Sequence, residues 1–134
     1  MWTYEITQGK MYRPDGSLLA VGYSGGYGGG EFTADKNNPD AENVVGEGPI
    51  PEGLWTFGNL FMDLEMGCPD VLRLTPDPAT DLKGRSAVGF LIHGDGKNDA
   101  GMASKGCIIL PPQARVEMGQ SADHQLSVVA IVSK

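Results

Sequence analysis

The sequence predicts a single mostly β domain over residues 1–134, built as a β-sandwich or partly open barrel with one short helix. Three observations support this prediction. The 134 residues amount to one domain's worth of core. The 20 Gly and 9 Pro interrupt any long helix. The apolar residues, 40% of the chain, recur in short runs of strand length that are separated by turn residues.

The N-terminal region is predicted to form a β-meander. Trp2, Tyr4 and Ile6 alternate with polar residues, which is the period of a half-buried strand. A second extended run covers residues 18–23 and follows a Pro-Asp-Gly turn sequence. The Gly-rich and Pro-containing stretch 24–53 is expected to be a long loop, and such loops in compact domains are often functional.

Strand patterns resume after this loop. One helix is expected from Pro112 to Met118, with a proline in its first turn and Gly119 just after its end. Short apolar runs bounded by turn residues predict further strands at 54–57, 71–75, 88–93, 107–110 and 126–132.

Charge and hydropathy exclude several classes of partner. The net charge is −7 and the ten Lys and Arg residues are scattered, whereas nucleic-acid binding depends on concentrated positive charge. No stretch approaches the ~20 consecutive apolar residues of a membrane span. The N-terminus lacks the basic and apolar regions of a secretory signal, so we expect synthesis in the cytoplasm without a signal peptide.

Cofactor and metal motifs are missing from the sequence. The glycine run at 25–30 has neither the spacing of a dinucleotide fingerprint nor that of a P-loop, which leaves a flexible loop or the border of a substrate groove. The segment from Asp95 to Asp99 has Lys97 at a calcium-ligand position and is expected to be a polar turn. Two Cys and two His without metal-ligand spacing predict no metal, no cofactor and no disulfide framework.

One cysteine and one histidine stand out by their positions. His93 ends an apolar run, and Cys107 begins another after a glycine-rich connection. Neighbouring strands that end at one rim would bring the thiol near an imidazole that can take its proton. Gly106 permits a sharp turn that would direct the N–H groups of residues 106 and 107 at an oxyanion, and Ser104 would orient the site. The alternative is a buried cysteine beside a histidine that is satisfied at a strand end.

The segment His-Gly-Asp, eight residues, Ala-Ser-Lys-Gly-Cys-Ile resembles the signature of the L,D-transpeptidase (YkuD-like) catalytic domain. The Pro-Glu-Gly-Leu-Trp run near residue 53 is similar to an upstream strand of that family. The order of motifs resembles most a compact subfamily that includes antibacterial type VI secretion effectors. The resemblance covers about residues 2–116, and the segment from His93 to Cys107 is its most specific part.

This resemblance implies a cysteine enzyme that modifies the tetrapeptide stems of peptidoglycan. Cys107 would be the nucleophile and His93 the general base, with Gly94 and Ser104 beside them and the backbone at Gly106 in the oxyanion hole. Removal of the terminal D-Ala through an acyl-enzyme would give L,D-carboxypeptidase action, and an amine acceptor would give exchange or crosslinking. The alternatives are a non-catalytic peptidoglycan-binding module and another cysteine amidase or endopeptidase.

Two positions depart from the family pattern. Lys105 stands where many members have His, and Ile109 stands where many have an Arg that would hold a substrate carboxylate. We therefore predict Arg85 as the replacement anchor, with Arg115 as the second choice. Asp95 and Lys105 complete the predicted substrate-binding set.

The remaining expectations concern spare residues and partners. Cys68 is predicted to be an idle thiol in a turn, and His124 to be solvated. If the resemblance holds, the enzyme works in the periplasm of a target cell. A secretion apparatus would deliver it, and a cognate immunity protein would protect the producer.

Overall fold

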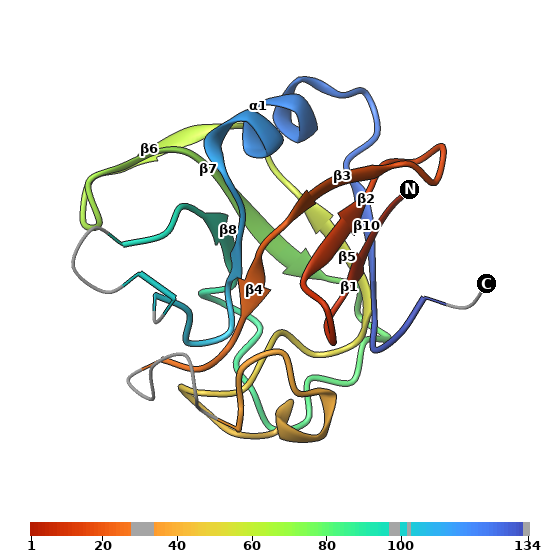
Figure 1. The fold of residues 1–134 in the computed structure, drawn as a ribbon, viewed down its shortest axis with the longest axis vertical. Helices are drawn as coiled ribbons and strands as arrows, with labels where there is room; N and C mark the ends of the chain where they lie inside the picture. The colour runs from red at the N-terminus through yellow and green to blue at the C-terminus, as the bar shows by residue number, and fades with distance from the viewer. Residues whose placement is uncertain (28–33, 97–99, 102, 133–134) are drawn as a thin grey trace.

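The computed structural model describes residues 1–27, 34–96, 100–101 and 103–132. Within them the chain forms ten strands, one short 3-10 helix and one α-helix (Figure 1). The elements are β1 (Trp2–Glu5), β2 (Lys10–Tyr12), β3 (Leu18–Val21), β4 (Tyr23–Ser24), η2 (Pro39–Ala41), β5 (Gly53–Phe57), β6 (Phe61–Asp63), β7 (Cys68–Pro76), β8 (Leu91–His93), β9 (Ile108–Ile109), α1 (Pro112–Gln120) and β10 (Gln125–Val129).

The strands form one curved sheet that nearly closes into a barrel. Their order is β3-β2-β1-β10-β5-β7-β8-β9-β4, and β6 pairs with β7 at the side of this path. The two ends of the path, β3 and β4, are consecutive in the chain with only Gly22 between them. The predicted mostly β, partly open barrel with one short helix is therefore confirmed.

Gly22 makes the bend from β3 into β4 possible. Its N–H donates to Gly9 O at 2.7 Å, and a Cβ at this position would lie 1.7 Å from Ile109 O. No side chain fits at that distance, so only glycine lets the chain pass the end of β9 this closely.

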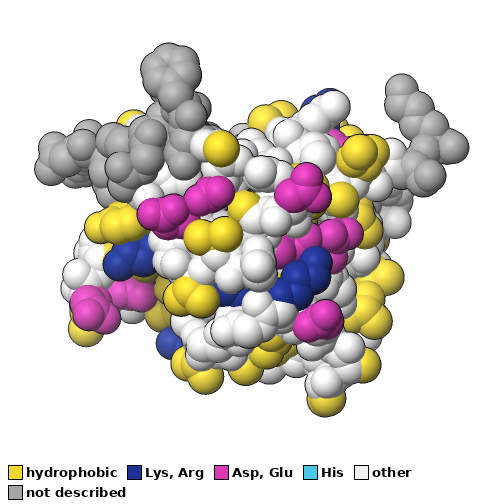
Figure 2. Space-filling view, turned by 90° about the horizontal axis from the view of Figure 1, so that it is seen from below, with side chains coloured by type: hydrophobic (Ala, Val, Ile, Leu, Met, Phe, Trp, Pro, Cys, Tyr) yellow, Lys and Arg dark blue, Asp and Glu magenta, His cyan; other side chains and the backbone are white. Residues whose placement is uncertain are grey.

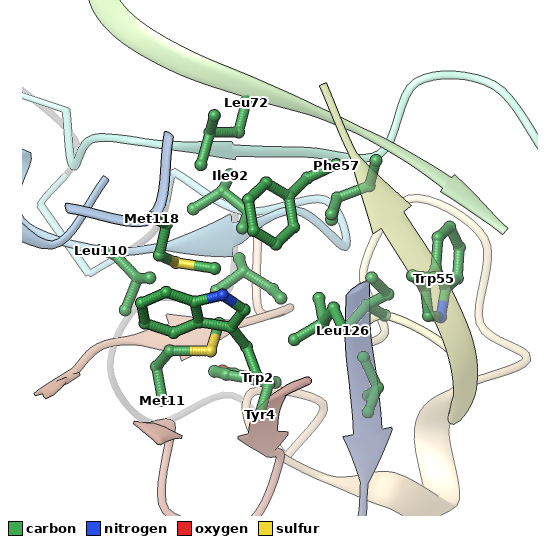
Figure 3. Close-up of a cluster of buried hydrophobic side chains, with 14 of the residues drawn as sticks. Trp2, Tyr4, Met11, Trp55, Phe57, Leu72, Ile92, Leu110, Met118 and Leu126 are labelled. Carbon is green, nitrogen blue, oxygen red and sulfur yellow. The ribbon is translucent and has the colours of Figure 1, made fainter. Parts of the chain in front are cut away.

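The core lies inside the curved sheet, with α1 covering one open end (Figure 1). Trp2 of β1, Trp55 of β5 and Met118 of α1 are each at most 1% exposed and belong to one cluster of buried side chains (Figure 3). Burial of a large apolar side chain stabilises a fold by roughly 1.5–3 kcal/mol. Trp2 and Tyr4 thus mark the inner face of β1, and Ile6 continues the predicted alternation just after the strand.

The helix extends beyond its predicted end at Met118. It runs to Gln120, with Ser121 as the capping residue, so Gly119 lies inside the helix rather than after it. A Cβ on Gly119 would lie 2.4 Å from Leu60 Cγ. The glycine is therefore explained by close packing of the helix against Leu60 and not by helix termination.

Other boundaries also shift. The predicted strand at 88–93 is reduced to β8, because Gly89 has a φ of +104° and turns the chain just before it. The stretch 24–53 is mostly loop, but it includes Ser24 of β4 and the short helix η2. Residues 28–33, which hold part of the glycine run, lie outside the described residues.

The described surface agrees with the scattered charge of the sequence. Figure 2 shows Lys and Arg side chains interspersed among Asp and Glu, with no large basic patch on that face. Among the described residues, no helix combines the length and apolar character needed to cross a membrane.

Candidate active site

Cys107 and His93 lie on the same face of two paired strands. β8 and β9 run parallel, with Ile92 opposite Ile108 and His93 opposite Ile109. Ile92 and Ile108 are fully buried in the core. Because side chains alternate along a strand, His93 points to the opposite face, and position 107 falls on that face when the alternation of β9 is continued by one residue. Cys107 stands one place before β9, so positions 107 and 93 are diagonal neighbours in this register.

The thiol of Cys107 contacts the backbone of the chain just before His93. Leu91 N–H donates to the sulfur at 3.4 Å, and the thiol donates to Gly89 O at 3.5 Å. No hydrogen bond joins this sulfur to the His93 ring within the described residues. Burial raises the pKa of the Cys107 thiol, although the Leu91 N–H and the charge of Arg85 oppose that effect. The resting Cys107 side chain is therefore a neutral thiol.

His93 is held as a neutral base. Its Nδ1 lies 2.8 Å from Gly94 O. A carbonyl oxygen only accepts hydrogen bonds, so Nδ1 carries the proton and Nε2 keeps its lone pair. Burial lowers the pKa of His93, and the positive charge of Arg115 lowers it further. Nε2 has no partner among the described residues and can accept a proton.

Ser104 organises the turn that carries Cys107. This fully buried hydroxyl donates to Cys107 O at 2.5 Å and accepts from Gly106 N–H at 3.1 Å and from Gly25 N–H at 2.8 Å. Ser104 therefore holds the turn that carries Cys107. The Gly106 N–H is engaged by this hydroxyl and is not free to bind an oxyanion, which corrects the expected role of that group.

Gly106 is required by its surroundings. Its φ is +141°, in a region that favours glycine. An added Cβ would lie 2.4 Å from Arg85 Nη2 and 2.8 Å from Phe90 Cε1. The glycine before Cys107 thus makes room for a buried guanidinium.

Arg85 is not placed to anchor a substrate. Its side chain is 8% exposed, and its donors are used on backbone carbonyls. Nη1 donates to Glu42 O at 2.9 Å and Pro49 O at 3.1 Å, while Nη2 donates to Gly48 O at 3.3 Å and Lys105 O at 2.8 Å. The prediction of Arg85 as the carboxylate anchor is therefore wrong for this conformation. The residue instead ties the 42–49 loop to the turn that holds Cys107.

A groove of about 1220 Å³ opens beside His93. Its chemically active lining is Tyr23, Cys68, His93, Asp95 and Arg115, and Cys107 is not among its lining residues. The groove lies toward the C-terminal ends of β8 and β9, whereas Cys107 stands at their N-terminal ends. His93 is therefore situated between the groove and the proposed nucleophile.

Cys68 is closer to this groove than the sequence suggests. It begins β7, and Arg115 Nη1 donates to its sulfur at 3.5 Å. The same sulfur lies 3.6 Å from the Cβ position of Gly94. The sequence signal for this placement is weak, because the contact forms only when the β6–β7 hairpin pairs beside β8. The thiol is part of the groove and is not an isolated turn residue.

Asp95 and Lys105 have clear structural partners. The Asp95 carboxylate accepts from Tyr23 Oη at 2.5 Å and from the N–H groups of Gly96 and Gly101 at 3.0 and 3.1 Å. Asp95 thereby closes a polar turn, of which residues 97–99 lie outside the described part. Lys105 is exposed, with Nζ 4.5 Å from the ring centre of Tyr27.

The described residues contain no group of three or more His, Cys, Asp or Glu side chains that could hold a metal ion.

The second histidine, His124, has hydrogen-bond partners for both ring nitrogens. His124 Nδ1 and Nε2 lie 2.8 Å from Phe57 O and 2.9 Å from Ser121 O, and its ring stacks on Phe57. His124 is therefore a structural residue that is partly buried, which corrects the expectation of a solvated side chain.

Comparison with known proteins leaves the family open. No protein-family model matches the chain, and no curated protein does so either.

Proposed function

We propose that this protein is a cysteine-dependent enzyme of the L,D-transpeptidase type, acting on the tetrapeptide stems of peptidoglycan. The observation that supports the proposal is the position of Cys107 and His93 as diagonal neighbours in the register of two adjacent parallel strands, with no partner for His93 Nε2 among the described residues. Acyl transfer through a thioester requires a thiol, a proton shuttle and a site that stabilises the oxyanion. The first two are supplied by these residues.

In the proposed reaction, substrate binding brings the carbonyl of the third stem residue to the Cys107 sulfur. The sulfur attacks the carbonyl carbon while its proton moves to His93 Nε2. The tetrahedral intermediate then collapses, the bond to the terminal D-Ala breaks, and His93 returns the proton to the departing amine. Water, activated in turn by His93, hydrolyses the thioester, or a D-amino acid or second stem takes the acyl group.

The resting geometry sets one requirement for this reaction. The neutral thiol and imidazole are diagonal neighbours without a direct hydrogen bond. Proton transfer therefore needs a rotation of the Cys107 side chain away from Gly89 O, or a bridging water, when the substrate binds. Catalytic hydrogen bonds often tighten only in the complex, so this requirement is compatible with the proposal.

The proposed substrate also places the activity. Peptidoglycan lies outside the cytoplasmic membrane, so we propose action in the periplasm of a target cell. Delivery by a secretion apparatus and protection of the producer by an immunity protein form part of this proposal.

Purified tetrapeptide muropeptides test the reaction. We expect the protein to remove the terminal D-Ala, or to exchange it for an added D-amino acid, as followed by mass spectrometry. The activity should disappear in Cys107→Ala and survive in Cys68→Ala, a matched variant that removes the other thiol. Retention of uncleaved tetrapeptide would favour a binding module, and cleavage at another bond would favour an amidase or endopeptidase.

A further inference from the structure

The guanidinium of Arg115 forms a fixed wall of the groove beside His93. The residue is 3% exposed and belongs to α1. Its Nε donates to Leu110 O at 3.1 Å, and its Nη1 donates to Pro69 O at 2.7 Å and Asp70 O at 3.1 Å. These bonds hold the plane of the guanidinium in one orientation.

The Nη2 group of Arg115 differs from Nε and Nη1 in its hydrogen bonding. It has no acceptor among the described residues, and it lies 2.9 Å from the Cβ position of Gly94, next to His93. The residue takes part in none of the ion pairs of the described chain. Arg115 thus presents two N–H donors of a buried cation to the groove without a carboxylate partner.

We propose that Arg115 Nη2 forms a carboxylate-binding subsite at the His93 end of the groove. The inference rests on the proposed function, because the ligand it names is a carboxylate of the stem peptide. A desolvated guanidinium with its orientation fixed favours a carboxylate over a neutral group, since the hydrogen bonds are charge-assisted. Arg85, the other buried arginine of the described residues, lacks this property because both of its terminal nitrogens already bond to carbonyls.

Gly94 is part of the same arrangement. A side chain there would meet Nη2 at 2.9 Å and Cζ at 3.4 Å, and so would fill the approach to the cation. The glycine after His93 therefore keeps the guanidinium accessible beside the base. This role is independent of the bond from His93 Nδ1 to Gly94 O.

Binding of a carboxylate here also affects the base. The charged groups that act on His93 are Arg115, which lowers its pKa, and Asp63 and Asp95, which raise it. Cys68 is a further titratable group in the groove. A bound carboxylate compensates the charge of Arg115, so His93 becomes a stronger base when a substrate is in place.

A peptide series tests the subsite. Two carboxylates of a stem are candidates, the terminal one and the one at the far end of the diamino acid. Four tetrapeptides, with both free, either one amidated, or both amidated, are titrated into Cys107→Ala protein, which binds without turnover. Binding is followed by the NMR signals of the His93 ring. These signals are assigned with the variant His124→Gln, in which His93 is the remaining histidine.

We expect amidation of one carboxylate to weaken binding at least tenfold and to abolish the rise of the His93 pKa. The carboxylate whose amidation does this is the one bound. Equal affinity of all four peptides, or binding that leaves the His93 pKa unchanged, would overturn the subsite. Because this assay needs no turnover, it separates the two proposals. If the His93 pKa shifts with a free carboxylate but the wild-type protein releases no D-Ala, the subsite is supported and the proposed enzyme activity is contradicted. If D-Ala is released equally from all four peptides, the enzyme activity is supported and the subsite is contradicted.

Discussion

Replacement of Arg85 by methionine tests whether this residue holds the site together. The substitution keeps the apolar contact with Phe90 but removes the donors to four backbone carbonyls. Each buried acceptor left unpaired costs about 1–3 kcal/mol, and relaxation of the loop recovers part of this. We expect the free energy of unfolding to fall by about 3–5 kcal/mol, a large fraction of the roughly 5–15 kcal/mol of a typical domain.

The effect is measured by urea unfolding and by thermal unfolding, where Tm should fall by roughly 10–20 °C. Arg73→Met is the matched control. Arg73 lies over the ring of Phe61 at 5.0 Å, as Arg85 lies over that of Phe90 at 5.2 Å, but Arg73 is exposed and its side chain makes no hydrogen bond within the described residues. The control should lose less than about 1 kcal/mol. Equal losses in both variants, or an Arg85 variant of native stability with only a raised KM, would refute this account.

Four further predictions concern the loop and the site. Burial raises the pKa of Glu42 to about 7, although the ammonium of Lys83 opposes this, so the folded protein keeps a proton that the unfolded chain loses near 4.5. The full shift corresponds to about 3 kcal/mol, which solvent screening reduces to about 2 kcal/mol. The free energy of unfolding should fall by this amount as pH rises between the two values, and Glu42→Gln should flatten that slope. Burial moves the pKa of His93 below 6.5 and that of Cys107 above 9.0, so kcat/KM should be constant between these pH values. A rate of iodoacetamide labelling of Cys107 that rises with an apparent pKa near neutrality would contradict a neutral thiol and a neutral imidazole at rest. Ser104→Ala should cost about 1–3 kcal/mol in urea unfolding, because two buried N–H groups lose their acceptor, and should lower kcat; a variant with native values of both would remove the positioning role. Gly106→Ala should destabilise the fold by a similar amount through the contact with the buried guanidinium, and unfolding at the native urea midpoint would disprove that contact.

The sequence predicts the fold class well because the strongest strand signals are local. The alternation at Trp2, Tyr4 and Ile6 and the apolar run of β10 are readable in short windows. β6 is missed because its three residues gain their stability from pairing with β7, a contact that no short window contains. Gly119 misleads for a similar reason, since its packing against Leu60 is a tertiary contact.

In the candidate site, too, some features can be predicted from local sequence and others depend on tertiary contacts. His93 and Cys107 are adjacent to glycines and Ser104 is two residues from one, and the structure brings the three residues to one pair of strands and one turn. The direction in which each arginine points is not encoded locally. Arg85 turns inward to the carbonyls of a distant loop, whereas Arg115 reaches the groove from α1, so the order of preference between them could not be set from sequence.

Identification of the nucleophile is the most direct test of the central claim. A tetrapeptide substrate is mixed with the protein, the reaction is quenched in acid, and the acyl adduct is located by peptide mass spectrometry. The account predicts a thioester on Cys107 that carries the stem without its terminal D-Ala and that is absent in His93→Gln. An adduct on Cys68, which contacts Arg115 in the groove, or product formation by Cys107→Ala would contradict it.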